Sequence, residues 1–280
     1  MEEKNSKSKP IIVIKYGGNA MVSENLQRAV LKNICTLKAQ GYAVVIVHGG
    51  GPFIQEILDQ VDIKSEFIHG HRKTSPEALR YVEMALKGRV NGEVVNIINS
   101  LGQTAVGLSG RDGKIITAKR YYHEHNDNGN IIRTDLGQVG EVSQIDPRLI
   151  YLLLEQDYIP VITCIATDEE GNSYNINADL FAGSLAGHLN AQVFGVLTDV
   201  DGLMRDINDP DSLIREISLQ HIKQFIDEGV IKGGMIPKTD ACRLAVEKGA
   251  SRATIINGKK PEQILSLMDE NQSIGTTIKL

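Results

Sequence analysis

The chain has 280 residues, of which 41% are hydrophobic, so it is long enough and apolar enough to bury a sizeable core. Its net charge of -5 argues against nucleic-acid partners and anionic membranes, because both reward clustered positive charge. The three cysteines are widely spaced and show no metal-ligand pattern, so we expect no disulfide framework and a reducing, cytoplasmic location.

The chain opens with the polar stretch MEEKNSKSKP, which lacks the apolar segment of a secretory signal. No run in the sequence approaches the ~18 uninterrupted apolar residues of a membrane-spanning helix. We therefore expect a short solvated tail and no membrane partner.

A strand, a loop, a helix and a second strand are predicted next. Residues 10–15 form a β-branched run that ends in glycines, which indicates a buried strand feeding a tight loop. Ser23 can cap a helix over residues 25–40, where apolar residues recur at helical spacing. A second buried strand is expected at residues 42–47.

The order strand, Gly-rich loop, helix recurs in residues 43–59, and apolar strands are predicted at 159–163 and 193–198, each beside a helical segment. This alternation indicates a mostly parallel sheet with helices on both faces. Residues 114–142 and 164–177 instead alternate in polarity and contain turn signals, which predicts antiparallel hairpins that project from the sheet.

The sequence shows no internal repeat and no Pro/Ser-rich linker. We expect an N-terminal lobe over residues 11–190 and a C-terminal lobe over residues 191–280, packed rigidly together. A single continuous domain is the alternative.

Two Gly-rich loops follow the first two predicted strands. Lys15 leaves the first strand into Gly17 and Gly18, and HGGGP (residues 48–52) follows the second. Beyond the carboxyl ends of parallel strands, backbone N–H groups and an ammonium group can converge on phosphate oxygens. The alternative is that the glycines only permit sharp turns. No Walker A motif occurs, and HGGGPFI lacks the third glycine of the dinucleotide-binding fingerprint.

Four further polar residues have two interpretations each. Lys238, in GGMIPK, is either functional or a solvated residue at a helix start. Asp179 precedes an apolar helix and is either functional or its N-cap. Asp199 and Asp201, in TDVDGL, either contact ATP or its metal or form an ordinary turn. His48 is expected to orient its glycine loop rather than to react.

Seven motifs together resemble the amino-acid kinase superfamily, and within it the acetylglutamate kinase family. They fall in family order and cover nearly the whole chain: KYGGNA from Lys15, HGGGP from His48, GHRKT from Gly70, VGLSG from Val106, NINAD from Asn175, TDVDG from Thr198 and GGMIPK from Gly233.

The resemblance implies a three-layer αβα sandwich with a mostly parallel open sheet, the carbamate kinase-like fold. It implies that the N-terminal lobe binds the amino acid and the C-terminal lobe binds ATP, with Mg²⁺ held mainly by the nucleotide phosphates and no protein metal site. The implied reaction moves the γ-phosphoryl group of ATP to the side-chain carboxylate of N-acetyl-L-glutamate, the second step of arginine biosynthesis.

The resemblance also implies roles for single residues. Lys15 and Lys238 would stabilise the transferring phosphoryl group, and Asp179 would hold both lysines. Arg72 would bind the substrate α-carboxylate, because its planar fork suits a carboxylate, and Asn175 would fix the acetylated amino acid. The remaining residues are backbone donors or nucleotide contacts: Gly50 and Gly51 for the substrate, and Gly17, Gly18, Asp199, Asp201 and Gly202 for the nucleotide.

The sequence departs from the family pattern in its opening segment. Family members that form hexamers and respond to arginine carry a long amphipathic helix before the first strand, and the ten polar residues here do not supply one. We therefore predict a homodimer, with an interface on a helix over residues 77–86 whose apolar residues are Ala78, Tyr81, Val82 and Ala85. The alternative is that this helix face belongs to the core. His71 and Lys73 stand where the family usually has apolar residues.

Two other interpretations stay open. One is a different amino-acid kinase chemistry, such as phosphorylation of glutamate or of aminoadipate on a carrier protein. The other is a non-catalytic metabolite sensor with the same fold.

Overall fold

The computed structural model describes residues 9–21, 23–68, 70–127, 130–269, 272 and 274–280. Their centre is an eight-stranded sheet in the order β12-β14-β13-β11-β1-β2-β8-β5. The strands are Ile11–Tyr16 (β1), Ala43–His48 (β2), Ala105–Ser109 (β5), Ile159–Thr163 (β8), Val193–Thr198 (β11), Glu216–Ser218 (β12), Ala253–Asn257 (β13) and Thr276–Lys279 (β14). From β5 to β13 all neighbours run parallel, and β14 is antiparallel to β13. The predicted mostly parallel sheet is confirmed.

Alternate side chains of the central strands enter two different cores. In β1, Ile12 and Ile14 belong to one core and Val13 to the other, as the period of two in a strand requires. Because both faces are covered, the strand is apolar from Ile11 to Ile14, which is why its sequence there is a continuous β-branched run.

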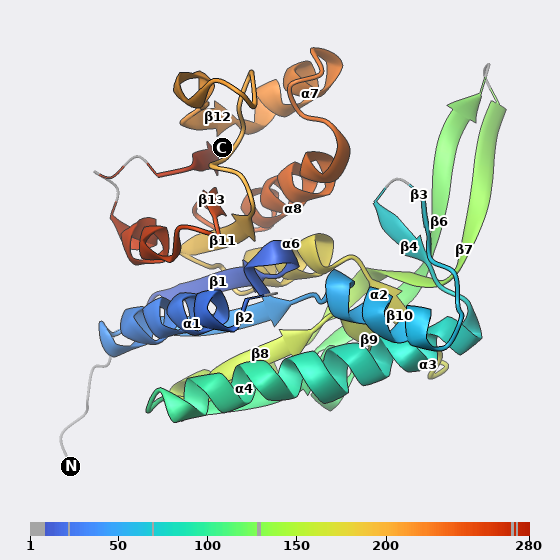
Figure 1. The fold of residues 1–280 in the computed structure, drawn as a ribbon, viewed down its shortest axis with the longest axis horizontal. Helices are drawn as coiled ribbons and strands as arrows, with labels where there is room; N and C mark the ends of the chain where they lie inside the picture. The colour runs from blue at the N-terminus through green and yellow to red at the C-terminus, as the bar shows by residue number, and fades with distance from the viewer. Residues whose placement is uncertain (1–8, 22, 69, 128–129, 270–271, 273) are drawn as a thin grey trace.

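Helices cover both faces of the sheet, which confirms the three-layer αβα architecture. The α-helices are Glu24–Ala39 (α1), Gly51–Gln60 (α2), Pro76–Glu83 (α3), Asn91–Ser100 (α4), Arg148–Glu155 (α5), Ala178–His188 (α6), Leu219–Asp227 (α7) and Ile236–Glu247 (α8). Helices α1 and α4 contribute to the core that contains Ile12, and helices α5, α6 and α8 contribute to the core that contains Val13. Figure 1 shows α1 and α6 with β1 and β2 between them. Ser23 stands at the N-cap of α1 as predicted, but its side chain makes no capping hydrogen bond.

The two predicted hairpins are present, and they pair with each other. Ile116–Asp127 (β6) and Asn130–Ile145 (β7) form one antiparallel pair, and Ile165–Thr167 (β9) and Ser173–Ile176 (β10) form the other. Parallel contacts join β10 to β7 and β6 to β9, so the four strands close into a small barrel. The far half of β6 and β7 extends away from the body of the molecule (Figure 1).

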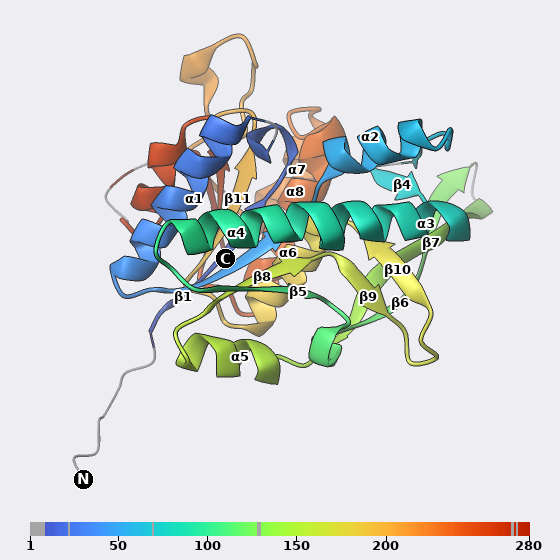
Figure 2. The ribbon, with the colours of Figure 1, turned by 60° about the horizontal axis from the view of Figure 1, so that its bottom comes forward.

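A long continuous helix begins at α3, passes through the π-helical segment Met84–Val90 (η2) and ends with α4 (Figure 2). The prediction that its apolar face forms a dimer interface is wrong. Ala78, Val82 and Ala85 are at most 4% exposed and belong to the protein's own core, and Tyr81 packs partly buried against it. Helical periodicity identifies an apolar face but not the surface that covers it.

The remaining elements are short. They are the strands Glu66–Ile68 (β3) and His71–Lys73 (β4), which pair with each other, and the 3-10 helices Gly18–Met21, Asp112–Lys114, Pro210–Ser212, Gly233–Met235 and Pro261–Met268. None of the described helices is long and apolar enough to cross a bilayer.

Residues 1–8 of the tail lie outside the described residues, so the structure does not bear on the hexamer argument. One sheet runs through both predicted lobes, because β11 of the C-terminal part pairs directly with β1.

The three cysteines are free and buried.

Candidate active site

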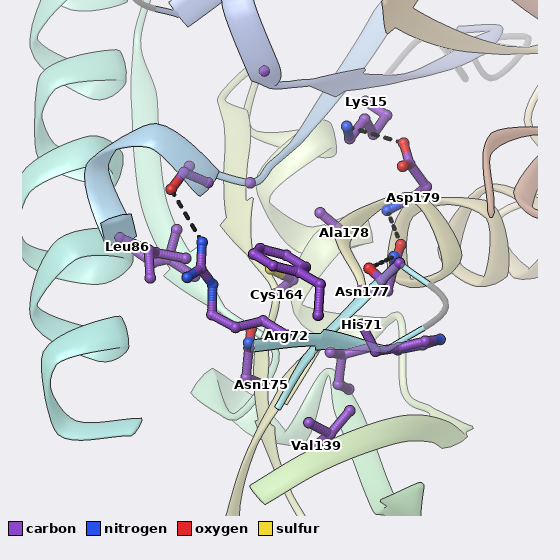
Figure 3. Close-up of a pocket in the computed structure, with 18 residues that line it drawn as sticks. Lys15, His71, Arg72, Leu86, Val139, Cys164, Asn175, Asn177, Ala178 and Asp179 are labelled. Carbon is purple, nitrogen blue, oxygen red and sulfur yellow. Dashed lines mark hydrogen bonds and ion pairs between the residues drawn. The ribbon is translucent and has the colours of Figure 1, made fainter. Parts of the chain in front are cut away.

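The candidate site lies where β1 and β2 end, at the carboxyl edge of the parallel sheet. A cavity of about 190 Å³ opens there, and its lining includes Lys15, Gly50, Gly51, Arg72 and Asn175 (Figure 3). These residues come from β1, the loop into α2, β4 and β10. The topology thus gathers all four predicted substrate residues in one place.

A buried cluster of three charges adjoins this cavity. The Asp179 carboxylate lies 2.9 Å from Lys15 Nζ through Oδ1, and its Oδ2 accepts a hydrogen bond from Lys238 Nζ at 3.0 Å. Burial lowers the pKa of Lys15, and the nearby Lys238 lowers it further while Asp179 opposes this effect. Burial tends to raise the pKa of Asp179, but the two lysines outweigh it and lower that pKa. The cluster carries one net positive charge when all three groups are ionised.

Helix α6 brings Asp179 into this cluster, and the N-cap interpretation of Asp179 is wrong. The cap is Asn177, whose side-chain oxygen accepts hydrogen bonds from the N–H groups of Asp179 (2.9 Å) and Leu180 (3.3 Å). Because the cap is supplied two residues earlier, the Asp179 carboxylate is left to face the lysines. Asn177 lies within the NINAD motif but was given no predicted role, although Asn before an apolar helix is a typical cap.

Lys238 lies in the first turn of α8, directly after a short 3-10 helix. Its side chain is 19% exposed. The interpretation of a freely solvated lysine is therefore wrong. The role of Lys238 in catalysis stays a prediction.

The two glycine loops meet the site in different ways. A Cβ on Gly17 would lie 3.2 Å from Lys15 Nζ, so this glycine leaves room for the ammonium group. Gly18 has a φ of 65°, where side chains are strained. Gly50 has a φ of 169°, outside the left-handed region, yet a Cβ there would meet Leu86 Cδ2 at 2.8 Å. Close packing, rather than a left-handed turn, therefore requires glycine at position 50.

Arg72 is buried on β4, so its interpretation as a surface ion pair is wrong. Its guanidinium donates hydrogen bonds to Gln55 Oε1 at 2.9 Å and to Ser65 Oγ. It also donates one to the Gly51 carbonyl oxygen at 3.4 Å (Figure 3). It also lies 4.5 Å from the centre of the Phe67 ring. Burial lowers the pKa of Arg72, and Asp59 partly opposes this. The hydrogen-bond partners are all neutral, so the charge is available to a carboxylate in the cavity.

The amide of Asn175 donates a long hydrogen bond, 3.4 Å, to Thr74 Oγ1. Several other side chains in the cavity wall were not predicted, among them His71, Cys164, Val139 and Leu86 (Figure 3). His71 stacks on Tyr121 with ring centres 4.4 Å apart. Burial raises the pKa of the Cys164 thiol to about 12, so the thiol stays protonated. Nothing in the sequence distinguished Cys164, Val139 and Leu86 from ordinary core, and His71 stood out only as a departure from the family pattern.

The predicted nucleotide residues after β11 do not line this cavity. Asp201 accepts hydrogen bonds from Asn257 Nδ2 at 2.8 Å and Lys260 Nζ at 2.9 Å, which tie it to the end of the neighbouring strand β13. Asp199 accepts a bond of 3.4 Å from Thr198. At Gly202 φ is +143°, and a Cβ would lie 2.6 Å from Thr276 Oγ1, so packing accounts for this glycine. The three residues remain predicted nucleotide contacts at the same edge of the sheet.

The arrangement suits the chemistry of anions. Two lysines and backbone N–H groups at the end of β1 and β2 can neutralise the oxygens of a phosphoryl group, and Arg72 can hold a carboxylate nearby. Among the described residues, no group of three or more His, Cys, Asp or Glu is placed to hold a metal ion.

Comparisons with known proteins agree with this geometry. Residues 10–257 match the model of the amino acid kinase family. The chain is 44% identical over 267 residues to the acetylglutamate kinase of Methanococcus aeolicus, covering 95% of this chain and 91% of that protein. It is also 44% identical to the acetylglutamate kinase of Heliobacterium modesticaldum, with the same coverage. The structure of Giardia lamblia carbamate kinase bound to AMP-PNP has the same fold, with a TM-score of 0.66 and 18% identity over 97% of this chain and 99% of that one. The chain therefore belongs to the amino acid kinase family and, within it, to the acetylglutamate kinases.

Proposed function

We propose that this protein transfers the γ-phosphoryl group of ATP to the side-chain carboxylate of N-acetyl-L-glutamate. The products are N-acetyl-L-glutamyl 5-phosphate and ADP, in the second step of arginine biosynthesis. The observation that carries the proposal is the buried Lys15–Asp179–Lys238 cluster beside a cavity that also contains Arg72. The relatives that are 44% identical over nearly the whole chain support this substrate.

The reaction requires neutralisation of charge more than it requires a base. A side-chain carboxylate with a pKa near ~4.3 is already ionised at neutral pH, so no residue has to remove a proton from it. One of its oxygens bonds to the γ-phosphorus as the bond from that phosphorus to the β–γ bridging oxygen breaks, and ADP leaves with the electron pair. Lys15 and Lys238 would stabilise the charge on the transferring group, and Asp179 would keep the two ammonium groups together.

The other cavity residues would orient the acceptor. Arg72 would hold the α-carboxylate of N-acetyl-L-glutamate with two parallel hydrogen bonds. Asn175 would contact the acetylated amino group, and the N–H groups of Gly50 and Gly51 would donate to the bound substrate. Together these contacts would fix the attacking oxygen in line with the phosphoryl group.

ATP would lie across the carboxyl edge of the sheet, with its phosphates near Gly17 and Gly18. Its nucleoside part would lie against the C-terminal lobe, residues 191–280, near Asp199, Asp201 and Gly202. Mg²⁺ would be held mainly by the nucleotide phosphates, where it adds positive charge to the transferring group. The substrate would occupy the N-terminal lobe, residues 11–190.

The test is a trapping experiment with hydroxylamine, which converts an acyl phosphate into a hydroxamate. The purified protein, ATP and Mg²⁺ are incubated separately with N-acetyl-L-glutamate, L-glutamate and 2-aminoadipate. We expect hydroxamate and ADP with the first substrate. Equal or faster turnover of L-glutamate would overturn the substrate assignment, and binding of N-acetyl-L-glutamate without ADP release would identify a metabolite sensor.

We also propose a cytoplasmic homodimer. Because Ala78, Val82 and Ala85 are buried within the protein, the interface would use other surfaces than the predicted one. Light scattering should give twice the mass of the chain, with and without arginine. A hexameric mass would contradict this proposal.

A further inference from the structure

His48 is a buried residue that joins the end of β2 to the glycine loop. It is fully shielded from solvent, and it does not line the cavity, whereas Gly49, Gly50 and Gly51 do. Its Nδ1 lies 2.9 Å from the carbonyl oxygen of Gly49, and its Nε2 lies 2.8 Å from Asn91 Nδ2. Both ring nitrogens thus have a partner inside the protein.

Asn91 determines which ring nitrogen carries the proton. Its Nδ2 also lies 3.0 Å from the carbonyl oxygen of Val161, which can only accept a hydrogen bond. This atom must therefore be the amide nitrogen, so it donates to Nε2 of His48. The proton of the neutral ring is then on Nδ1, from which it donates to the Gly49 carbonyl. Burial lowers the pKa of His48 to about 4, with a smaller contribution from Lys87, which agrees with a neutral ring.

The bond from His48 fixes the orientation of one peptide group in the loop. In a trans peptide, the carbonyl of one residue and the N–H of the next point in opposite directions. The Gly49 carbonyl is held toward the buried ring, so the N–H of Gly50 points away from it. Gly50 is one of the residues that line the cavity. His48 thus controls the direction of a donor at the candidate site.

Residues of the π-helical segment pack against the same loop. Leu86 and Val90 lie so close to Gly50 that a Cβ there would be 2.8 and 3.2 Å from their side chains. Asn91 follows immediately in the chain and enters the space beside Gly107, where a Cβ would lie 2.1 Å from Asn91 Oδ1. A π-helical turn changes the helical register locally and is frequent at functional sites. Here the helix presents all three residues to the end of β2.

We propose that His48 and Asn91 are positioning residues that orient the Gly49–Gly50 peptide, so that the N–H of Gly50 donates to the oxygens that carry negative charge during phosphoryl transfer. The proposal rests on the proposed function, because it assigns to that donor a share of the stabilisation of the reacting groups. Neither residue lines the cavity, so each would act through the loop rather than by contact with the substrate.

Two variants separate the bonds of His48. In His48→Asn the side-chain amide can take the place of Nδ1–H and donate to Gly49, but the bond to Asn91 is lost. In His48→Gln the side-chain oxygen can accept from Asn91, but the donor to Gly49 is lost. Loss of one preorganised donor typically lowers kcat by ~10²-fold. We therefore expect kcat of His48→Gln to fall by ~10²-fold, and His48→Asn to recover most of that loss.

The kinetics are compared with the thermal stability of each variant. The control variant is His221→Asn, because His221 is exposed on α7, where its Nδ1 lies 2.8 Å from Ser218 Oγ. If His48 had only a structural role, both variants would be less stable, and kcat per folded enzyme would be equal in the two. That result, or a kcat of His48→Gln close to that of the native protein, would overturn the proposal.

A second measurement does not depend on activity. In ¹⁵N-labelled protein, the NMR shifts of the His48 ring should show a protonated Nδ1 and an unprotonated Nε2, and Asn91→Leu should release the ring to a mixture of tautomers. A native ring with its proton on Nε2 would overturn the proposal even in an active enzyme. Conversely, the protein could show the Nδ1–H tautomer and yet make no hydroxamate. That result would support the hydrogen bonds from Asn91 to His48 and from His48 to Gly49, and it would contradict the proposed function.

Discussion

Lys15 and Asp179 form an ion pair of 2.9 Å in which each side chain is only 8% exposed. Burial of two charges costs free energy that their attraction repays only with good geometry, so such a pair is weak evidence for stability. Its position at the end of β1, beside a cavity, favours a role in binding or catalysis instead.

We expect Lys15→Ala and Lys238→Ala each to lower kcat by ~10²-fold or more, because each ammonium group stabilises charge that develops in the transition state. KM for N-acetyl-L-glutamate should change far less. Steady-state kinetics of hydroxamate formation measures both constants. The control is Lys223→Ala, which alters an exposed lysine of α7. A loss confined to KM would show that the lysines only bind substrate.

Arg72→Lys should raise KM for N-acetyl-L-glutamate by ~10- to 100-fold, because a point charge replaces a planar fork and a charge-assisted hydrogen bond is worth ~1.5–3 kcal/mol. The effect on kcat should be smaller, since the lysine cluster is unchanged. Arg89→Lys is the matched control, because Arg89 pairs with Glu56 and Glu93 at the surface. If both variants keep the native KM, Arg72 is not part of the substrate site.

The protein should lose stability as the pH falls from about 6.5 toward about 4. Burial, the largest cause, lowers the pKa of His48 to about 4, whereas an unfolded histidine titrates near 6.5. Between these values the unfolded chain binds a proton that the folded protein excludes. The contribution of His48 to the free energy of unfolding is therefore complete above the unfolded pKa. It is lost, by roughly 3 kcal/mol in all, as the pH falls through that window.

Urea unfolding at about pH 7 and about pH 5 measures this loss. The variant His48→Asn removes the titrating group, so its free energy of unfolding should depend less on pH over the same window. Identical pH dependence in the two proteins would mean that His48 takes up its proton in the folded state as readily as in the unfolded state.

The sequence predicted the sheet well because a strand covered on both faces must be apolar at every position. The runs that became β1, β2, β8 and β11 had that property. The pairing of β6 with β9 and of β7 with β10 joins segments far apart in the chain, and periodicity carries no information on such contacts. The closed barrel was therefore missed even though both hairpins were predicted.

The site was predictable where a motif carries its chemistry in the sequence. Lys15, Asp179 and Lys238 were found through their motifs, and their mutual contacts are present in the structure. Asn91 was missed because a single Asn in a helix carries no sign of the partners it reaches. Leu86 ended the predicted helix over residues 77–86 but was given no role for a related reason: nothing in the helix reveals that Gly50 packs against it.

The close approach of Gly50 and Leu86 leads to a prediction with an internal test. The backbone of Gly50 has a φ of 169°, which any residue can adopt, so Gly50→Ala should fold. Its new Cβ would nevertheless lie 2.8 Å from Leu86 Cδ2, and the loop or the helix must shift. We expect kcat/KM to fall by ~10- to 100-fold, because small displacements of a positioned donor are costly.

Leu86→Ala opens space at that contact, and as a large-to-small change in the core it should cost ~2–5 kcal/mol of stability. In the double variant Gly50→Ala/Leu86→Ala the methyl group at position 50 enters the space that the leucine vacates. We therefore expect the double variant to have a higher kcat/KM, per folded enzyme, than Gly50→Ala alone. Gly92→Ala is the control, because a Cβ at this helical glycine meets nothing within 4 Å. If the two losses simply add, the methyl group harms activity by some route other than its contact with Leu86.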